Sequence, residues 1–195
     1  MKKLIFLSLI SIFLLSSCVT PRYGVKVGGN YATIGGDDTD NIDGKIGLYL
    51  GGVAELGITD RFAVQPEVLF SQQGAKYSDS GGFDGQFNFN YINVPIMAKF
   101  KPSDAFSIEL GPQIGFLLTA KDKFDSPTSG EDDIKDFVGS TDFGGNIGIG
   151  YELDMGLNFN ARFNYGFSNI NDFDTGGLDI SNNNCVFSLG VGWMF

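Results

Sequence analysis

The sequence predicts an all-β protein, folded as an eight-stranded antiparallel up-and-down transmembrane β-barrel. Three observations lead to this fold class. Apolar and polar residues alternate along several segments, the connections between those segments are short and long in turn, and the alternation continues to a terminal phenylalanine. The chain has 195 residues, which is enough for one domain.

The alternation has the period of two that a β-strand with one apolar face requires. It is clear over residues 23–31 and 106–118, and it is longest over residues 157–168. In that last segment one face holds Leu157, Phe159, Ala161, Phe163, Tyr165 and Phe167, and the other holds Asn158, Asn160, Arg162, Asn164 and Gly166. No segment after residue 20 has a convincing helical period, so we expect strands throughout.

The same alternation places eight strands along the chain. We expect them near residues 22–34, 44–58, 62–74, 87–100, 105–119, 142–153, 156–169 and 184–195. Tight turns are expected at 59–61, at 101–104 and around Asp154, and long polar loops at 35–43, 75–86, 120–141 and 170–183. Short turns on one rim and long loops on the other are typical of outer-membrane barrels.

One strand departs from the simple pattern. The apolar phase of the fourth strand shifts between Tyr91 and Ile92, and Pro95 follows closely. An extra residue in one strand shifts the side chains to the other face, and proline cannot donate to the ladder. We therefore predict a β-bulge between Tyr91 and Ile92.

The apolar face is expected to meet lipid. The interior of an eight-stranded barrel is only just filled by side chains, and the polar face is mostly small Gly, Ser and Asn, whereas the other face carries the rings. Aromatic residues also recur near both ends of several strands, as two girdles around an apolar band would require. These pairs are Tyr23 and Tyr31, Phe62 and Phe70, Phe106 and Phe116, Phe143 and Tyr151, and Phe159 and Phe167. A packed soluble core would instead concentrate its aromatics in the middle of each strand.

Both ends of the chain carry signals for export and assembly. Lys2 and Lys3 precede an apolar stretch from Leu4 to Leu15, which is too short to span a bilayer and predicts a signal peptide over residues 1–17. The residues before Cys18 resemble a lipobox, so either Cys18 is acylated or ordinary cleavage occurs nearby. The barrel domain then occupies residues 18–195. At the other end, the alternating residues of the last strand resemble the signal for the barrel-assembly machinery: Phe187, Leu189, Val191, Trp193 and Phe195.

Charged residues on the inward face form the candidate site. The cations are Lys26, Lys45, Lys99 and Arg162, and the carboxylates are Glu55, Glu67, Glu109 and Glu152. Unpaired charges inside a narrow barrel are costly, so we expect salt bridges. All of these residues except Lys45 fall close to the rim with the short turns. We predict a salt-bridged plug in that half of the barrel; the alternative is a polar path for protons or a solute.

Composition excludes several classes of function. The chain has no histidine, so the histidine-dependent chemistry of barrel-borne hydrolases and acyltransferases is absent, and we predict no catalytic residue. The formal net charge is −10, which argues against a nucleic-acid partner. We expect no cofactor and no metal. A disulfide between Cys18 and Cys185 has no support from their spacing.

Four segments together resemble the PorT-like outer-membrane β-barrel family of Bacteroidetes, often labelled "porin family protein". They begin at Gly24, Gln65, Tyr91 and Gly111, and read GVKVGGNY, QPEVLFSQQGAK, YINVPIMAKF and GPQIGF. The resemblance runs from about residue 22 to the C-terminus. It implies an eight-stranded barrel in the outer membrane of a Gram-negative cell, without establishing diffusion through a pore. PorT itself is associated with type IX secretion.

Three function classes remain open. The leading hypothesis is a structural or interaction barrel that contacts outer-membrane lipid, lipopolysaccharide or other outer-membrane proteins. The second is a narrow porin or a secretion-associated barrel, and the third, an enzyme, is disfavoured by the absence of histidine. The expected outer loops carry acidic clusters, for which solvated loops are a commoner explanation than Ca²⁺ or Mg²⁺ sites. These clusters are Asp37, Asp38 and Asp40; Glu131, Asp132 and Asp133; and Asp172, Asp174 and Asp179.

Overall fold

A computed structural model describes residues 20–37, 39, 41–78, 84–125, 129–171 and 181–195. Its elements follow the order β1 (Arg22–Gly36), β2 (Ile42–Gly57), β3 (Phe62–Ser78), β4 (Asp84–Phe100), β5 (Phe106–Asp125), β6 (Ser129–Asp133), η1 (Lys135–Phe137), β7 (Thr141–Glu152), β8 (Leu157–Gly166) and β9 (Asn182–Met194). Among these residues no helix has the length and apolarity needed to cross a membrane. The predicted signal peptide and Cys18 lie outside the described residues.

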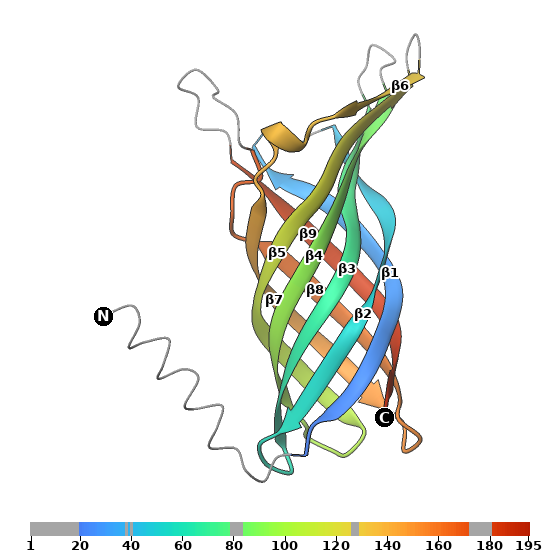
Figure 1. Cartoon of the computed structure of the whole chain (residues 1–195), viewed down its shortest axis with the longest axis vertical. Helices are drawn as coiled ribbons and strands as arrows, with labels where there is room; N and C mark the ends of the chain where they lie inside the picture. The colour runs from blue at the N-terminus through green and yellow to red at the C-terminus, as the bar shows by residue number, and fades with distance from the viewer. Residues whose placement is uncertain (1–19, 38, 40, 79–83, 126–128, 172–180) are drawn as a thin grey trace, which may run out of the picture.

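The strands close into a barrel, as Figure 1 shows. Each strand of the ring pairs antiparallel with the next, and β1 pairs with both β2 and β9. Val27, for example, stands opposite Leu50 on one side and Val191 on the other. Eight strands form the ring, while β6 pairs only with the outer end of β5. The predicted eight-stranded up-and-down barrel is therefore confirmed.

The two faces of the wall follow the alternation in the sequence. Most of the leucine, valine and aromatic side chains of the wall point outward, and 56% of the surface of Val27 is exposed. Polar side chains point inward, and Asn30 on the same strand is only 3% exposed. Rings of both expected girdles are on the outside, including Tyr23, Tyr31 and Phe167. The wall thus presents a broad apolar surface to its surroundings and keeps its polar groups inside.

The two rims differ as the sequence predicts. The short turns between β2 and β3, β4 and β5, and β7 and β8 lie together at the end that also holds the C-terminus (Figure 1). In the first of these turns the Thr59 hydroxyl accepts hydrogen bonds from the backbone N–H groups of Arg61 and Phe62. In the third, Gly156 has a φ of 90°, which favours glycine. In an outer-membrane barrel the rim with short turns faces the periplasm.

At the opposite, outer rim the strands are longer than expected. β3 continues to Ser78, and β5 continues to Asp125. The segment 120–141, which we expected to be a long loop, contains the end of β5, the strand β6 and the short helix η1. That expectation is wrong because pairing among β4, β5 and β6 satisfies the backbone hydrogen bonds of this segment without an apolar face that the sequence could reveal.

The irregularity expected in the fourth strand belongs to its neighbour. The register between β4 and β5 shifts between Asn90 and Tyr91, where Asn90 pairs with Thr119 and Tyr91 pairs with Leu117. The extra residue is therefore Leu118 on β5, within one residue of the predicted level but on the other strand. In β4 the inward face continues unbroken, and it carries Phe89 and Tyr91 into the barrel.

Candidate functional site in the barrel lumen

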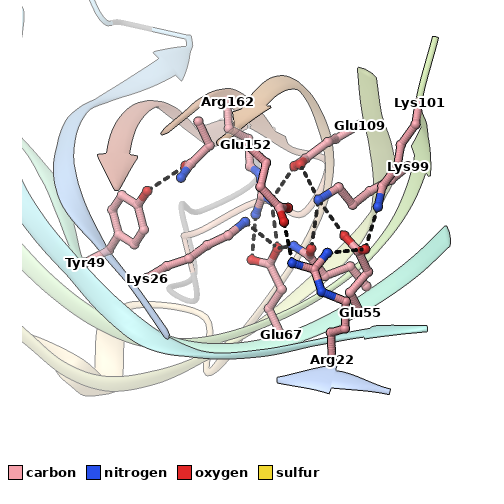
Figure 2. Close-up of polar contacts among 12 residues, drawn as sticks. Arg22, Lys26, Tyr49, Glu55, Glu67, Lys99, Lys101, Glu109, Glu152 and Arg162 are labelled. Atoms are coloured by element: carbon pink, nitrogen blue, oxygen red, sulfur yellow. Dashed lines mark hydrogen bonds and ion pairs between the residues drawn. The ribbon is translucent and has the colours of Figure 1, made fainter. Parts of the chain in front are cut away.

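A network of paired charges lies inside the barrel (Figure 2), and its residues come from the parts of the strands nearest the short turns, in the periplasmic half. It contains five cations and four carboxylates, and we call it the charge network: Arg22, Lys26, Lys99, Lys101, Arg162, Glu55, Glu67, Glu109 and Glu152. These side chains come from β1, β2, β3, β4, β5, β7 and β8, and from the turn after β4. The network therefore ties most of the ring together from the inside.

Glu67 lies at the centre of the network and is only 2% exposed. Arg162 donates to both of its oxygens, with both N···O distances at 2.9 Å. Lys26 donates to Glu67 Oε1 at 3.1 Å, and Gln65 donates to the same oxygen at 2.6 Å. A carboxylate with a bidentate guanidinium and an ammonium partner is held by charge-assisted hydrogen bonds, which are the strong class.

Arg162 reaches a second carboxylate because a glycine stands between them. Its Nη2 lies 3.0 Å from Glu109 Oε2. In the barrel register, Gly148 pairs with Glu109 on one side and with Arg162 on the other. A side chain at this inward position would stand between the two charges, so Gly148 lets the pair form across an intervening strand. Glu109 also pairs with Lys99, at 3.5 Å.

Glu55 holds together the edge of the network nearest the periplasm. It accepts hydrogen bonds from Lys99 at 2.9 Å and from Lys101 at 2.6 Å. Arg22 lies 3.4 Å from the same carboxylate and also pairs with Glu152. A void beside this edge measures about 10 Å³, which is room for about one water molecule.

The structure brings together all of the predicted lumen charges except Lys45. Lys45 lies nearer the outer rim, where its ammonium is 3.5 Å from the carbonyl oxygen of Gln73. Sequence reasoning missed Arg22 and Lys101, which lie at the first residue of β1 and just after β4. Both residues lie where the alternation stops, so the sequence carries no signal for the face on which their side chains lie.

A layer of uncharged polar side chains lies above the charge network. Asn30 donates to the Ser71 hydroxyl at 2.9 Å and accepts from Ser188 at 2.8 Å. Asn164 of β8 donates to Asn146 of β7 at 3.2 Å, and Asn146 donates to Gln113 of β5 at 3.3 Å. These hydrogen bonds join neighbouring or next-neighbouring strands on the inside of the barrel, and they satisfy polar groups that are closed off from water.

The outer third of the lumen is apolar, contrary to the expectation that all rings face outward. Phe89 and Tyr91 are buried with aliphatic neighbours from β1, β5 and the segment after η1. The cluster comprises Ile34, Ala75, Phe89, Tyr91, Leu117, Ala120, Val138 and Ile170. The expectation fails here because the strands extend beyond the apolar band. Above the band the inside of the barrel is the better-shielded face, so apolar side chains are buried there.

The acidic clusters expected in the loops are only partly described. Asp38, Asp40, Asp172, Asp174 and Asp179 lie outside the described residues. Glu131, Asp132 and Asp133 form part of β6, and Glu131 pairs with Lys121 and Lys123. Asp37 accepts a hydrogen bond from the backbone N–H of Ser181 at 3.1 Å. Within the described ranges, no three acidic or cysteine side chains are grouped so that they could hold a metal ion.

The residues of the predicted assembly signal all point outward along β9 and at its end. Phe187, Leu189, Val191, Trp193 and Phe195 are between 38% and 76% exposed. Cys185, on the same strand, is a free thiol that is partly buried. The last strand therefore presents a continuous apolar stripe on the outer wall.

Comparison with solved structures returns outer-membrane barrels. The fold is similar to Neisserial surface protein A, with a TM-score of 0.56 and 14% identity, over 89% of this chain and 97% of that one. It is similar to the attachment invasion locus protein Ail of Yersinia pestis, with a TM-score of 0.54 and 18% identity, over 89% and 98%. It is also similar to a major outer membrane protein of Thermus thermophilus, with a TM-score of 0.53 and 16% identity, over 90% of this chain and 100% of that one. At these identities the likeness shows the fold alone.

A search of curated proteins found no significant match. A family model described as "Outer membrane protein beta-barrel domain" matches residues 20–172. The match covers most of the chain and includes every strand of the ring except β9. The chain therefore belongs to the outer membrane protein beta-barrel domain family, and its place is the cell's outer membrane.

Proposed function

We propose that this protein is a closed outer-membrane barrel that works through the surface at its outer end, and not as a conduit. The observation that carries the proposal is the charge network, which crosses the lumen from β1 and β3 to β8 through Lys26, Glu67 and Arg162. These three side chains are buried and paired with one another, so passage of an ion would have to break several charge-assisted hydrogen bonds at once.

Two further barriers lie above the network. The side chains of the asparagine-rich layer are held in hydrogen bonds with one another, and the apolar cluster above it offers, apart from the Tyr91 hydroxyl, no polar side chain to replace the hydration shell of an ion. A narrow porin would need a continuous polar path between the rims, and the apolar cluster interrupts it. This favours the interaction barrel over the proton or solute path.

The outer end also offers a surface suited to lipopolysaccharide. Four lysines gather on or beside the outer wall where the strands leave the apolar band, and we call them the lysine patch: Lys45, Lys76, Lys121 and Lys123. In the barrel register Lys76, Gln86, Lys123 and Glu131 lie side by side across β3 to β6. Cations at this level are placed to meet the phosphate groups of outer-leaflet lipids. Ail, a structural neighbour, has been solved with the heparin analogue sucrose octasulfate, which is also polyanionic.

A role in secretion is the second candidate within this proposal. The segments beginning at Gly24, Gln65, Tyr91 and Gly111 resemble the PorT-like family, and a closed barrel is compatible with a scaffold for other outer-membrane proteins. Co-purification from native membranes with secretion components, lost on removal of the β5–β6 hairpin, would favour this candidate over a lipid-binding role.

Electrical recording tests the closed lumen. In planar bilayers the purified barrel should give no stable conductance, and vesicles that contain it should not swell in small sugars, because the three layers leave no continuous water path. A general porin in the same vesicles provides the control that swelling is detectable. Large, stable openings of this barrel would refute the closed-lumen proposal.

The mature N-terminus belongs to the same proposal. A signal peptide over residues 1–17 would deliver the chain to the periplasm, and the stripe that ends at Phe195 would direct its assembly. Mass spectrometry of the mature protein from native membranes distinguishes acylated Cys18 from ordinary cleavage, since each added acyl chain changes the mass by a known amount.

A further inference from the structure

The outer rim encloses a cavity that the closed-barrel proposal does not use. It has a volume of about 520 Å³ and lies inside the mouth formed by β1, β2, β4 and the segment around η1. Its wall is mostly apolar, and includes Ile34, Ile42, Phe87, Phe89, Ile134 and Ile170. Small-molecule sites typically have volumes of about 300 to 1,000 Å³ and walls of this kind. We call it the outer cavity.

The outer cavity is open at the top and closed at the bottom. Its inner wall merges with the apolar cluster, whose lowest aromatic ring, Tyr91, is only 1% exposed. Asn184 donates to the Tyr91 hydroxyl at 3.3 Å and to Asp142 Oδ2 at 2.8 Å, so a hydrogen-bonded polar floor lies directly beneath. A molecule that enters from outside the cell would therefore stop in the cavity and not continue through the barrel.

Part of the apolar wall is not covered by other side chains of the described residues. Phe137 lines the cavity, yet 57% of its surface is exposed. Burying such a ring against a ligand would gain free energy, since removal of apolar surface from water is favourable.

Polar groups at the rim limit what the ligand can be. Asp37, Thr39, Asn171 and Asn182 line the mouth, and Asp37 is the charged residue among the described lining residues. Asn171 donates to Asn182 Oδ1 at 2.7 Å, and Asn182 donates to the backbone oxygen of Asp37 at 2.8 Å, which fixes the rim. A carboxylate at the mouth of an apolar cavity attracts a cation and repels an anion.

We propose that the outer cavity binds a small apolar or aromatic molecule that carries one cationic group, with the apolar body against Phe87, Phe89 and Ile134 and the cation at Asp37. The site is independent of whether the lumen conducts, so failure of the closed-lumen proposal in bilayer recordings would leave this one standing.

Three probes that share one body and differ in head group test the proposal. They are 2-(1-naphthyl)ethylamine, 2-(1-naphthyl)ethanol and 1-naphthylacetate, titrated into the full barrel in lipid nanodiscs and followed by naphthalene fluorescence, with empty nanodiscs subtracted. The amine should bind saturably, the alcohol about three- to tenfold more weakly, and the acetate most weakly. Absence of saturable binding above empty nanodiscs, or tightest binding of the acetate, would overturn the proposal.

Variants then locate the site. Ile134→Trp fills the cavity and should weaken the amine at least about tenfold, whereas Leu153→Trp, at a turn on the periplasmic rim, should not. Should Ile134→Trp fail to fold, Ile134→Ser makes the same wall polar and should weaken all three probes. Asp37→Asn keeps an oxygen that can accept from Ser181 N–H, so it should abolish the preference for the amine over the alcohol without loss of alcohol binding. Equal amine binding in the wild type and in the Ile134 variants would contradict the assignment.

Discussion

Glu67 accepts more hydrogen bonds than any other carboxylate of the charge network, from Lys26, Gln65 and Arg162. The change Glu67→Gln keeps the size of the side chain but leaves Lys26 and Arg162 buried without their principal partner. We expect it to lower the free energy of unfolding by about 3 to 5 kcal/mol, the usual result of breaking a buried ion pair on one side. Urea unfolding of the barrel from lipid vesicles, followed by tryptophan fluorescence of Trp193, measures this change.

A second substitution tests whether the destabilisation by Glu67→Gln comes from leaving buried cations without a partner. Adding Lys26→Met to Glu67→Gln removes one of the unpaired cations, so the double variant should be less destabilised than the sum of the two single variants. Glu131→Gln, which neutralises a carboxylate on the surface, is the matched control and should leave global unfolding unchanged. Additive losses in the double variant would show that Lys26 and Glu67 are not coupled.

At the same scale, alternation revealed which charges point inward but not how they pair. The inward positions of Glu109 and Arg162 follow from strands with a period of two, whereas their contact depends on Gly148 in an intervening strand. Arg22 and Lys101 escaped because they stand beyond the alternating segments, where the sequence holds no signal for the face. We assigned Lys45 to the lumen from the alternation. A register shift between β2 and β3 interrupts the alternation there, and Lys45 lies with Gln72 and Lys121 near the outer end of the barrel.

The β5–β6 hairpin gives a prediction at the scale of an element. Hydrogen bonds from Lys121 and Lys123 hold the pKa of Glu131 below its ordinary value of 4.5. A carboxylate with a lowered pKa in the folded state stabilises the hairpin above the ordinary value, and this contribution is lost as the pH falls through the lower value. We therefore expect NMR signals of β6 in nanodiscs to shift with a midpoint below pH 4.5, and Glu131→Gln to remove that transition.

Asp122 provides an internal comparison on the neighbouring strand. Burial raises its pKa above the ordinary 3.8, although a hydrogen bond from the Tyr77 hydroxyl, at 2.9 Å, opposes this. The pKa of Asp122 should therefore be shifted up from its ordinary value, whereas that of Glu131 is shifted down, and we expect a midpoint for Asp122 above pH 3.8. A midpoint for Asp122 at or below pH 3.8 would contradict this expectation.

The elements inside the apolar band were predictable, and their outer extensions were not. Along β8 and β9 one face of the wall meets lipid and the other meets a polar lumen, so apolar and polar residues must alternate. The predicted bounds of these two strands are therefore within a few residues of the bounds in the structure. Above the band, Asn88, Lys121 and Glu131 face water on the outer wall, so the contrast between faces weakens and β6 resembles a loop in the sequence. The bulge was found at the correct level because the inward ring of Tyr91 breaks the expected pattern, but which strand holds the extra residue depends on pairing.

At the scale of the whole molecule, the barrel divides into tiers along its axis. The charge network lies towards the periplasm, the hydrogen-bonded asparagine layer lies above it, and the apolar cluster and outer cavity lie at the outer end. The wall is apolar on the outside at the level of the lower tiers, and it becomes polar where the lumen becomes apolar. This reversal places the change of surroundings, from lipid to water, near the row of Phe70, Ile92 and Phe116.

The placement of the lipid band can be measured through the cost of an outward charge at two depths. Leu189 is 56% exposed in the middle of β9, so Leu189→Arg should lower the free energy of unfolding from vesicles by about 2 to 4 kcal/mol, as a cation at the bilayer midplane does. Gln72 also points outward, but it lies just above the row of Phe70, and Gln72→Arg should cost only about 0 to 1 kcal/mol because the side chain reaches water and headgroups. An equal decrease in the free energy of unfolding for the two variants would mean that acyl chains do not surround the apolar wall at the depth of Leu189. The tiers of the barrel could then not be placed relative to the membrane in this way.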